Sequence, residues 1–379
     1  MATKVLALDL GSANIRAVEA EVRNNQPRIT KVFSMSIPSG IMEAGEVKDE
    51  EELSNMISEL LKKGGFKAKN VIISANGSPL QLRTINRIRA GQTDEDLKNT
   101  IPYVIRDYVP FDTDDYHYHF HTLSERRDPD DLMIYKKILL TAISKDYVDS
   151  IMNVLNKNKL RLNAIDAAPL ALIRAHHIAY DNYKPGTVVA SIDIGAETFT
   201  IAFHKNHQPV HNHISMTMGG NRITDRIAKE VRITFPEAEL LKVTSGLPDD
   251  EVRNLSTTVI LPNGSTRISA LKDFSPEVKE QVADIIAEES TNMISHINDI
   301  LDDFFANTNE TTVNEMVFSG GGVLLNNFIK RAAAEFRIPM RLAKLKSFEE
   351  NQKKLGPEII KNQHQFMTIL GVMVSRHEY

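Results

Sequence analysis

Two short stretches of the sequence, one at the start and one near the middle, follow the same plan. Residues 5–18 read VLALDLGSANIRAV and residues 189–202 read VASIDIGAETFTIA. In each, an apolar run leads to an aspartate, one apolar residue and a glycine, and small polar residues follow before apolar character returns. This order predicts a buried strand, a tight turn and a second strand. Because the plan occurs twice, we expect two related halves that carry one copy each.

The composition is that of a globular protein and excludes several classes. At 379 residues the chain is too long to fold around one small hydrophobic core, so two or three lobes are expected. A net charge of −5 without a long basic run argues against nucleic acid as a main partner. Cysteine is absent, which excludes disulfides and cysteine-ligated zinc. Without a signal peptide or an apolar run of about 18 residues, we expect a cytoplasmic protein that does not itself insert into a membrane.

Helical patterns alternate with the predicted strands, which favours a layered α/β architecture. Residues 50–63 carry apolar side chains at helical spacing and end at two glycines. A second helix is expected over 221–231, opened by Gly219 and Gly220. A third begins with Ser-Pro-Glu, a strong start signal, and is predicted over 275–305.

The region between the two copies has a different pattern. A helix, two strands and another helix are predicted there over 93–108, 116–121, 135–143 and 146–156. We therefore expect a small α+β unit at 79–160, inserted into the first half. In the second half, a polar stretch at 240–275 predicts part of an exposed subdomain with short strands.

The two aspartate turns have the residues that a magnesium-bound triphosphate requires. Gly11 and Gly195 permit tight turns whose backbone N–H groups can point at phosphate. Asp9 and Asp193 end the buried strands, where their carboxylates would face Mg²⁺ through water, because this ion dehydrates reluctantly. Ordinary hairpin turns explain each copy alone but explain a matched pair poorly. Further donors nearby are Ser12, Asn14, Thr198 and the cation Arg16.

A glycine run near the C-terminal end adds a third element. Gly320, Gly321 and Gly322 follow a strand predicted over 316–318 and precede a helix predicted over 323–336. A backbone without side chains would let a flat adenine ring approach closely, and the helix N-terminus would favour phosphate. A flexible connection explains a lone triple glycine equally well, but the order after two aspartate turns favours a binding role.

In this order, the motifs resemble those of the actin, sugar-kinase and chaperone ATPase superfamily, and within it the PilM and FtsA families over essentially the whole chain. Residues 7–11 (ALDLG) and 191–195 (SIDIG) look like its two phosphate motifs, and 317–322 (VFSGGG) looks like its adenosine motif. Three further similarities are the link between the halves at 164–169 (AIDAAP), the ribose- and adenine-contacting helix at 238–242 (AELLK), and Gly371 in the second connection between the lobes.

The resemblance implies an α/β protein with the actin-like two-lobed ATPase fold and a small α+β subdomain inserted into the first lobe. The first lobe would comprise 1–78 and 161–185, the inserted subdomain 79–160 and the second lobe 186–379. ATP and Mg²⁺ are the implied cofactors, with Asp9 and Asp193 positioning the metal and its water. The implied nucleotide contacts are Gly11, Ser12, Asn14, Arg16, Gly195, Ala196, Glu197, Thr198, Gly219, Gly220, Glu239, Lys242, Gly320, Gly321 and Gly322.

Two departures from the superfamily pattern bear on turnover. The second turn contains Glu197 where vigorous ATPases have only small residues, and no lysine follows the first turn, where Arg16 is the nearest cation. We therefore expect tight nucleotide binding with slow or no hydrolysis.

The likeness to PilM implies an ATP-binding component of type IV pilus assembly and twitching motility. The Val109-Pro110-Phe111 sequence resembles the signature of PilM's inserted subdomain, beside which a groove receives the N-terminal segment of the bitopic membrane protein PilN. That partner would hold the protein at the inner face of the cytoplasmic membrane, and other platform or motor proteins of the pilus are further implied partners. Candidates for the groove walls, which fit a protein core as well, are Leu80, Leu82, Ile85, Tyr103 and Ile105.

Two other functions of the superfamily are alternatives. A cell-division filament protein like FtsA would usually carry an amphipathic membrane helix after the fold, and none is expected here. A sugar or acetate kinase would need a substrate base and sugar-binding residues, and the sequence offers no convincing set.

The histidines are predicted to lie on solvated strand faces and not in a metal site. His117, His119 and His121 alternate along one strand and therefore share a face. The same prediction covers a second group around a hairpin at 205–209, namely His204, His207, His211 and His213.

Overall fold

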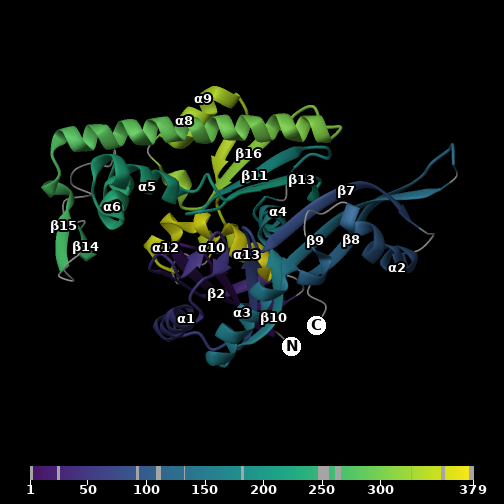
Figure 1. Cartoon of the computed structure of the whole chain (residues 1–379), viewed down its shortest axis with the longest axis horizontal. Coiled ribbons are helices and arrows are strands. Elements are labelled where there is room, and N and C mark those ends of the chain that lie inside the picture. Colours follow the sequence, from purple (N-terminus) through teal and green to yellow (C-terminus); the bar gives the residue numbers. More distant parts are fainter. Residues whose placement is uncertain are drawn as a thin grey trace.

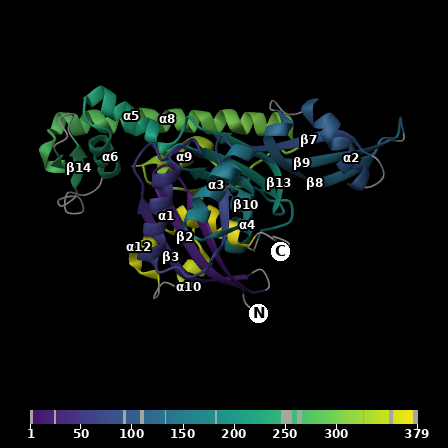
Figure 2. The same cartoon turned by 60° about the horizontal axis from the view of Figure 1, so that its bottom comes forward.

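Two lobes, each built around a five-stranded sheet, make up most of the protein, and two helices separate them (Figures 1 and 2). The structure is a computed structural model that describes residues 3–23, 26–90, 94–107, 112–131, 133–180, 183–245, 256–260, 266–325, 327–350 and 355–374. The Val109-Pro110-Phe111 signature lies outside these ranges.

The first sheet joins an antiparallel meander to parallel strands. Its order is β10-β6-β1-β2-β3; β1 pairs antiparallel with β2 and parallel with β6, which pairs parallel with β10. The strands are β1 (Thr3–Leu10), β2 (Asn14–Arg23), β3 (Gln26–Ser36), β6 (Asn70–Ala75) and β10 (Arg161–Ala167). A short hairpin between β3 and the first helix comprises β4 (Met42–Glu43) and β5 (Glu46–Val47).

The second sheet repeats this arrangement. Its order is β13-β12-β11-β16-β17, again a three-stranded meander followed by two parallel strands. The strands are β11 (Val188–Ile194), β12 (Phe199–Lys205), β13 (Gln208–Ser215), β16 (Glu315–Ser319) and β17 (Met340–Leu342). Asp9 pairs with Arg16 across the first turn, and Asp193 pairs with Thr200 across the second, so the two turns have the same register. The predicted duplication is confirmed.

Apolar cores lie on both faces of the first sheet. On one face, buried residues of the sheet pack with helices α1 (Glu50–Gly64) and α3 (Lys145–Lys157). Helix α1 matches its predicted range; Asp49 caps its start and Gly65, with a φ of 62°, ends it. On the other face, α4 (Ala168–Ala179) and α13 (Met367–Met373) fill the space between the two sheets, together with α10 (Lys346–Glu350) and α12 (Pro357–Lys361).

The second sheet is covered by four helices that share one large core. They are α5 (Gly220–Val231), α6 (Phe235–Thr244), α8 (Pro276–Asn307) and α9 (Phe328–Phe336). Helix α8 runs along the whole second lobe (Figure 1) and begins as predicted: Ser275 caps it and Pro276 occupies its first turn. The hairpin of β14 (Ser256–Ile260) and β15 (Thr266–Ala270) lies at one end of α8. None of the described helices is both long and apolar enough to cross a membrane.

A separate three-stranded sheet with its own small core lies at the opposite end of the molecule (Figures 1 and 2). Its order is β7-β9-β8, formed by β7 (Leu80–Ala90), β8 (Tyr116–Arg127) and β9 (Ile134–Ser144), and α2 (Asp94–Val104) packs against it. Helix α3 follows β9 in the chain but belongs to the core of the first lobe. The predicted domain boundaries at 79, 160 and 186 remain predictions.

The helix predicted over 323–336 starts later than expected. A single 3₁₀ turn, Gly322–Leu324, follows the glycine run, and α9 begins at Phe328. Asn327 has a φ of 58°, in the left-handed region, which prevents the helix from continuing back to the glycines. Helix α9 therefore does not begin directly after Gly320–Gly322, so the predicted helix start is wrong, and the contribution of its dipole to phosphate binding stays a prediction.

Helices α4 and α13 meet backbone to backbone at Gly371. A Cβ atom added there would lie 1.8 Å from the carbonyl oxygen of Ala171. The contact is reinforced by Arg174, which donates to the Gly371 carbonyl oxygen at 3.2 Å and forms an ion pair with Asp166 at the end of β10. Any side chain at 371 would force the two helices apart.

We expect Gly371→Ala to destabilise the protein, although alanine is the better helix former by about 1 kcal/mol. The added methyl group overpacks the crossing, with a net cost of roughly 1–3 kcal/mol. Urea unfolding measures the difference, and Gly321→Ala is the matched control, because a Cβ at Gly321 meets no atom within 4 Å. Equal stability of the two variants would contradict the role of this contact.

Candidate nucleotide-binding site

A cavity of about 330 Å³ opens between the lobes, where the two aspartate turns face each other. The turns come from equivalent ends of the two sheets, so the stacking of the lobes brings them together. Of the seventeen residues predicted to contact the nucleotide or its metal, sixteen line this cavity and Gly219 does not. Those that line it are Asp9, Gly11, Ser12, Asn14, Arg16, Asp193, Gly195, Ala196, Glu197, Thr198, Gly220, Glu239, Lys242, Gly320, Gly321 and Gly322.

Each aspartate is held by a serine from the neighbouring parallel strand. Ser74 on β6 donates to Oδ1 of Asp9 at 2.9 Å, and Ser319 on β16 donates to Oδ1 of Asp193 at 2.8 Å. The register explains the likeness, because Asp9 stands opposite Ser74 and Asp193 stands opposite Ser319. Both carboxylates are thus fixed in orientation while they face the cavity.

The electrostatic surroundings of the two carboxylates differ. Asp9 forms an ion pair with Arg16 at 3.1 Å, and Arg16 also donates to Oε1 of Gln365 at 3.0 Å. Asp193 has no such ion pair within the described residues; burial at the floor of the cavity raises the pKa of Asp193 to about 6, and the charge of Asp9 acts in the same direction. The Ser319 hydrogen bond and, to a smaller extent, the charge of Arg16 oppose this rise.

The two turns are built alike. The backbone N–H of Gly11 donates to the carbonyl oxygen of Asn14 at 3.1 Å, and that of Gly195 donates to the carbonyl oxygen of Thr198 at 2.8 Å. Gly219 lies behind the second turn, where a Cβ would be 2.2 Å from the carbonyl oxygen of Ala196. Its place explains why it supports the turn and does not line the cavity.

The glycine run forms a side-chain-free part of the cavity wall. Gly320 has a φ of 86°, and a Cβ there would lie 2.3 Å from the carbonyl oxygen of Ile194, so this position requires glycine. A Cβ at Gly322 would meet the Ile194 side chain at 2.3 Å. Gly321 faces open space.

Glu197 bridges the two lobes across the cavity mouth. Its Oε2 atom accepts hydrogen bonds from Ser12 Oγ at 2.7 Å and from the backbone N–H of Ala44 at 2.5 Å, both in the first lobe. Ser12 belongs to the first phosphate-type turn and Glu197 to the second, so this carboxylate occupies part of the space between them.

On the far wall, Glu239 and Lys242 of α6 pair with each other at 2.7 Å. Lys242 is buried and also donates to Thr224 Oγ1 at 2.7 Å and to the Gly220 carbonyl oxygen at 3.1 Å. One carboxylate and one ammonium group thus face the cavity in fixed positions, as a hydroxyl-rich ring and a planar base would require.

Several cavity residues were missed by the sequence analysis. One is Ser74, near the end of β6; its likeness to Ser319, which ends β16 within the predicted adenosine motif, was the available signal. Tyr147 is a second: burial raises the pKa of Tyr147, and the nearby charge of Asp9 acts in the same direction. Asn76, Gln365 and Thr368 come from distant segments and carry no motif of their own.

The donor set fits a magnesium-bound polyphosphate. Two fixed carboxylates supply the oxygen atoms that Mg²⁺ prefers, directly or through water. Asp193 forms no ion pair within the described residues, so its partly buried carboxylate is available to a bound cation. When bound, the ion would neutralise both carboxylates and polarise a phosphate group.

Four of the five residues predicted to line the partner groove are buried and do not form an exposed surface. Leu80, Leu82, Ile85 and Ile105 are buried, each 5% exposed or less. Ile85 and Ile105 belong to the core between α2 and the three-stranded sheet. These four are core residues in this structure, which was the alternative interpretation, and Tyr103 alone of the five is exposed, at 83%.

The histidine predictions divide into two outcomes. His117, His119 and His121 are exposed on one face of β8, as predicted. The prediction of a solvated face is wrong for His204, which is 2% exposed, because α4 covers this part of β12. His207, His211 and His213 are partly buried.

The fold and the cavity define the class, which is the actin-like ATPase fold. MreB 5 of Spiroplasma citri bound to AMPPNP shares the fold, with a TM-score of 0.51, 14% identity, and coverage of 98% of this chain and 96% of that one. The ethanolamine utilization protein EutJ from Carboxydothermus hydrogenoformans also matches, with a TM-score of 0.52, 14% identity, and coverage of 98% and 89%.

The family follows from the sequence. The profile described as "Type IV pilus assembly protein PilM" matches residues 7–262, which is more than half of the chain, so the protein belongs to the PilM family. The profile "Cell division protein FtsA" matches residues 190–371. The solved "PilM-PilN type IV pilus biogenesis complex" has a TM-score of 0.78, with 17% identity and coverage of 100% of both chains.

We expect Asp193→Asn to stabilise the ligand-free protein above pH 6. The pKa is raised from 3.8 to about 6 on folding, so ionisation favours the unfolded chain; the penalty is absent below pH 4, grows between pH 4 and 6, and is full above. Removing this ionisation penalty should raise the free energy of unfolding by roughly 1–3 kcal/mol at pH 8. The range extends below the full value of the pKa shift because water in the cavity screens the carboxylate.

Urea unfolding of wild type and Asp193→Asn from pH 4.5 to 8 measures this difference. Asp302→Asn, on the exposed side of α8, is the control for the loss of a carboxylate outside the cavity. A difference for Asp193→Asn that does not change with pH would contradict the inferred burial.

Proposed function

We propose that the protein is an ATP-binding component of the type IV pilus assembly machinery with slow or no ATP hydrolysis. The proposal rests on one observation. Two matched aspartate turns, each with its carboxylate held by a serine of the neighbouring strand, share one cavity with the glycine run. Membership of the PilM family supplies the context. The AMPPNP-bound relative of the same fold supports a nucleotide as the ligand.

Glu197 supports slow turnover. A triphosphate between the turns must displace or share the space of a carboxylate that already binds Ser12 and Ala44. This negative charge opposes the close approach of a γ-phosphate and its attacking water. Nucleotide binding would therefore serve mainly to set the separation of the lobes, since a ligand shifts a conformational equilibrium only by its differential affinity for the two states.

We expect Gly321→Phe to weaken ATP binding at least ten-fold while the fold is retained. Gly321 has φ −75° and ψ −30°, which any residue adopts, and its Cβ direction is open. A phenyl ring would occupy the proposed adenine shelf. Calorimetric titration with Mg-ATP measures the affinity, and Gly321→Ala is the matched small substitution.

Asp193→Ala is the second variant in this titration and should also lose affinity, because a proposed magnesium-facing carboxylate is removed. If wild type, Gly321→Phe and Asp193→Ala bind ATP equally, the nucleotide assignment fails. Release of γ-phosphate in the same samples should be slow, and its transfer to a sugar would support the kinase alternative.

We further propose that a short N-terminal segment of a PilN-like bitopic membrane protein docks beside the three-stranded sheet, and that this partner holds the protein at the inner face of the cytoplasmic membrane. The solved complex of similar structure contains PilM and PilN. Tyr103 on α2 is a large, exposed aromatic residue on this part of the molecule, the kind of side chain that dominates peptide interfaces.

We expect Tyr103→Ala to weaken binding of such a peptide roughly ten- to a hundred-fold, the loss typical of an aromatic anchor. Fluorescence anisotropy with a labelled peptide measures it. Ile268→Ala is the matched control, since Ile268 is another large, exposed apolar residue, on β15 at the opposite end of the molecule. Unchanged affinity in Tyr103→Ala, or a loss confined to Ile268→Ala, would place the peptide elsewhere.

A further inference from the structure

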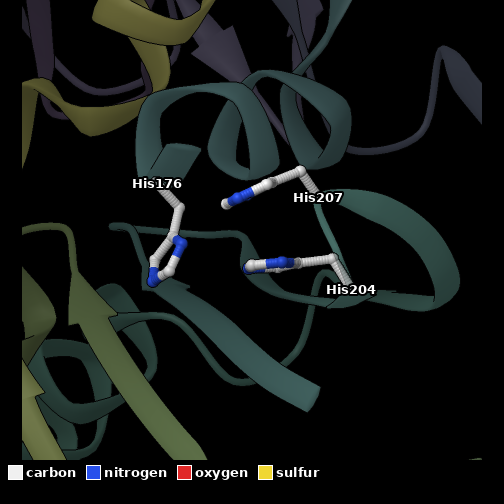
Figure 3. A group of neighbouring side chains, drawn as sticks. All are labelled: His176, His204 and His207. Carbon is white, nitrogen blue, oxygen red and sulfur yellow. The ribbon is translucent and has the colours of Figure 1, made fainter. Parts of the chain in front are cut away.

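Three histidine side chains converge away from the nucleotide cavity, between α4 and the β12–β13 hairpin (Figure 3). His176 lies on α4, His204 on β12, and His207 in the turn that joins β12 to β13. One ring nitrogen of each lies within 4.8 Å of the other two. His176 and His204 are 0% and 2% exposed, so two of the three rings are removed from solvent.

Two of these rings have a buried nitrogen without a hydrogen-bond partner, Nδ1 of His176 and Nδ1 of His207. Leaving a buried polar atom unpaired costs roughly 1–3 kcal/mol, so each such atom needs a reason. A metal ion that accepts the nitrogen lone pairs would supply one.

The hydrogen bonds around His176 determine which nitrogen carries its proton. The Tyr183 hydroxyl donates to Oε2 of Glu315, so its oxygen accepts, and the His176 Nε2 atom at 3.1 Å is the donor. Nδ1 therefore keeps its lone pair. A metal-binding histidine is usually oriented in this way, through a carboxylate or another acceptor at the far nitrogen.

Metal binding requires neutral imidazole rings, and burial favours the neutral form of all three. Burial lowers the pKa of His176 to about 2 and that of His204 to about 3, and the neighbouring histidines act in the same direction. Burial also lowers the pKa of His207. Arg341, whose charge acts on His176, is paired with Glu315 at 2.5 Å, so its charge is offset.

The cluster has room to close around an ion. Tetrahedral zinc with Zn–N bonds of about 2.0–2.1 Å needs nitrogens about 3.3 Å apart, so the rings must move together by about 1–1.5 Å. A cavity of about 150 Å³ adjoins His204 and His207 and is also lined by Tyr183 and Asn206. His207 stands in the hairpin turn outside both strands, and its ring packs against that of His177, with centroids 4.0 Å apart.

We propose that His176, His204 and His207 form a binding site for a late first-row divalent transition metal such as zinc. Three imidazole nitrogens are a donor set typical of these ions, and the adjoining cavity leaves a fourth position for water. The bound ion would tie α4, which separates the lobes, to the edge hairpin of the second lobe. The alternative is a purely structural cluster in which the rings pack against one another without a metal; the ring centroids of His176 and His204 are 4.6 Å apart.

The test uses tag-free, chelator-treated full-length protein titrated with Co²⁺, whose visible absorption reports tetrahedral nitrogen ligation, followed by displacement with Zn²⁺. Wild type should bind one equivalent. His207→Ala, the most exposed of the three positions, should weaken binding at least ten-fold, and His176→Gln should do the same. Tyr183→Phe keeps the aromatic ring but removes the hydroxyl that accepts from His176 Nε2. The His176 proton is then no longer held on that nitrogen, and metal binding should weaken about ten-fold.

The control removes the exposed histidines of β8 by combining His117→Ala, His119→Ala and His121→Ala, because alternating surface histidines bind metal adventitiously. This variant should retain the wild-type affinity and spectrum. The proposal is overturned if wild type gives no tetrahedral spectrum, if binding is lost in the β8 variant, or if it survives both His207→Ala and His176→Gln in protein whose circular dichroism is unchanged.

Discussion

The backbone contact between α4 and α13 sets the distance between the two sheets, and the cavity exists only at that distance. Gly371 allows the helices to touch, and Arg174 ties the Gly371 carbonyl to Asp166 at the end of β10. Each sheet delivers one aspartate turn at the same strand edge. A wider crossing would separate the turns and leave two unrelated hairpins, each with a carboxylate too far from its counterpart to share a cation.

The two copies of the turn have diverged in charge. In the first, Arg16 forms an ion pair with Asp9 from the opposite strand; in the second, the equivalent position is Thr200, and Asp193 forms no ion pair in the described part of the chain. Glu197 adds another carboxylate at the cavity mouth. The cavity is therefore poised for a ligand that brings its own cation, which fits a metal-bound nucleotide better than a free anion.

The sequence predicted the duplication, the two turns and the wall of glycines, because these depend on local patterns of apolar residues, aspartate and glycine. It could not predict that Ser74 would hold Asp9, since this contact depends on parallel pairing of strands far apart in the chain. The late start of α9 depends on the left-handed Asn327, and a periodic apolar pattern does not reveal it. The sequence could not predict the burial of His204 for a similar reason, because α4 comes into contact with β12 only in the tertiary fold.

Helix α4 connects the two proposed ligand sites. Its first residue, Ala168, lines the nucleotide cavity, Ala171 meets Gly371, and His176, about two turns after Ala168, belongs to the histidine cluster. A nucleotide that closes the lobes must act on the α4–α13 crossing, and a metal at the cluster would fix the other end of the same helix to the second lobe. If metal binding favours one position of α4, it must change nucleotide affinity, and linkage requires the nucleotide to change metal affinity by the same factor.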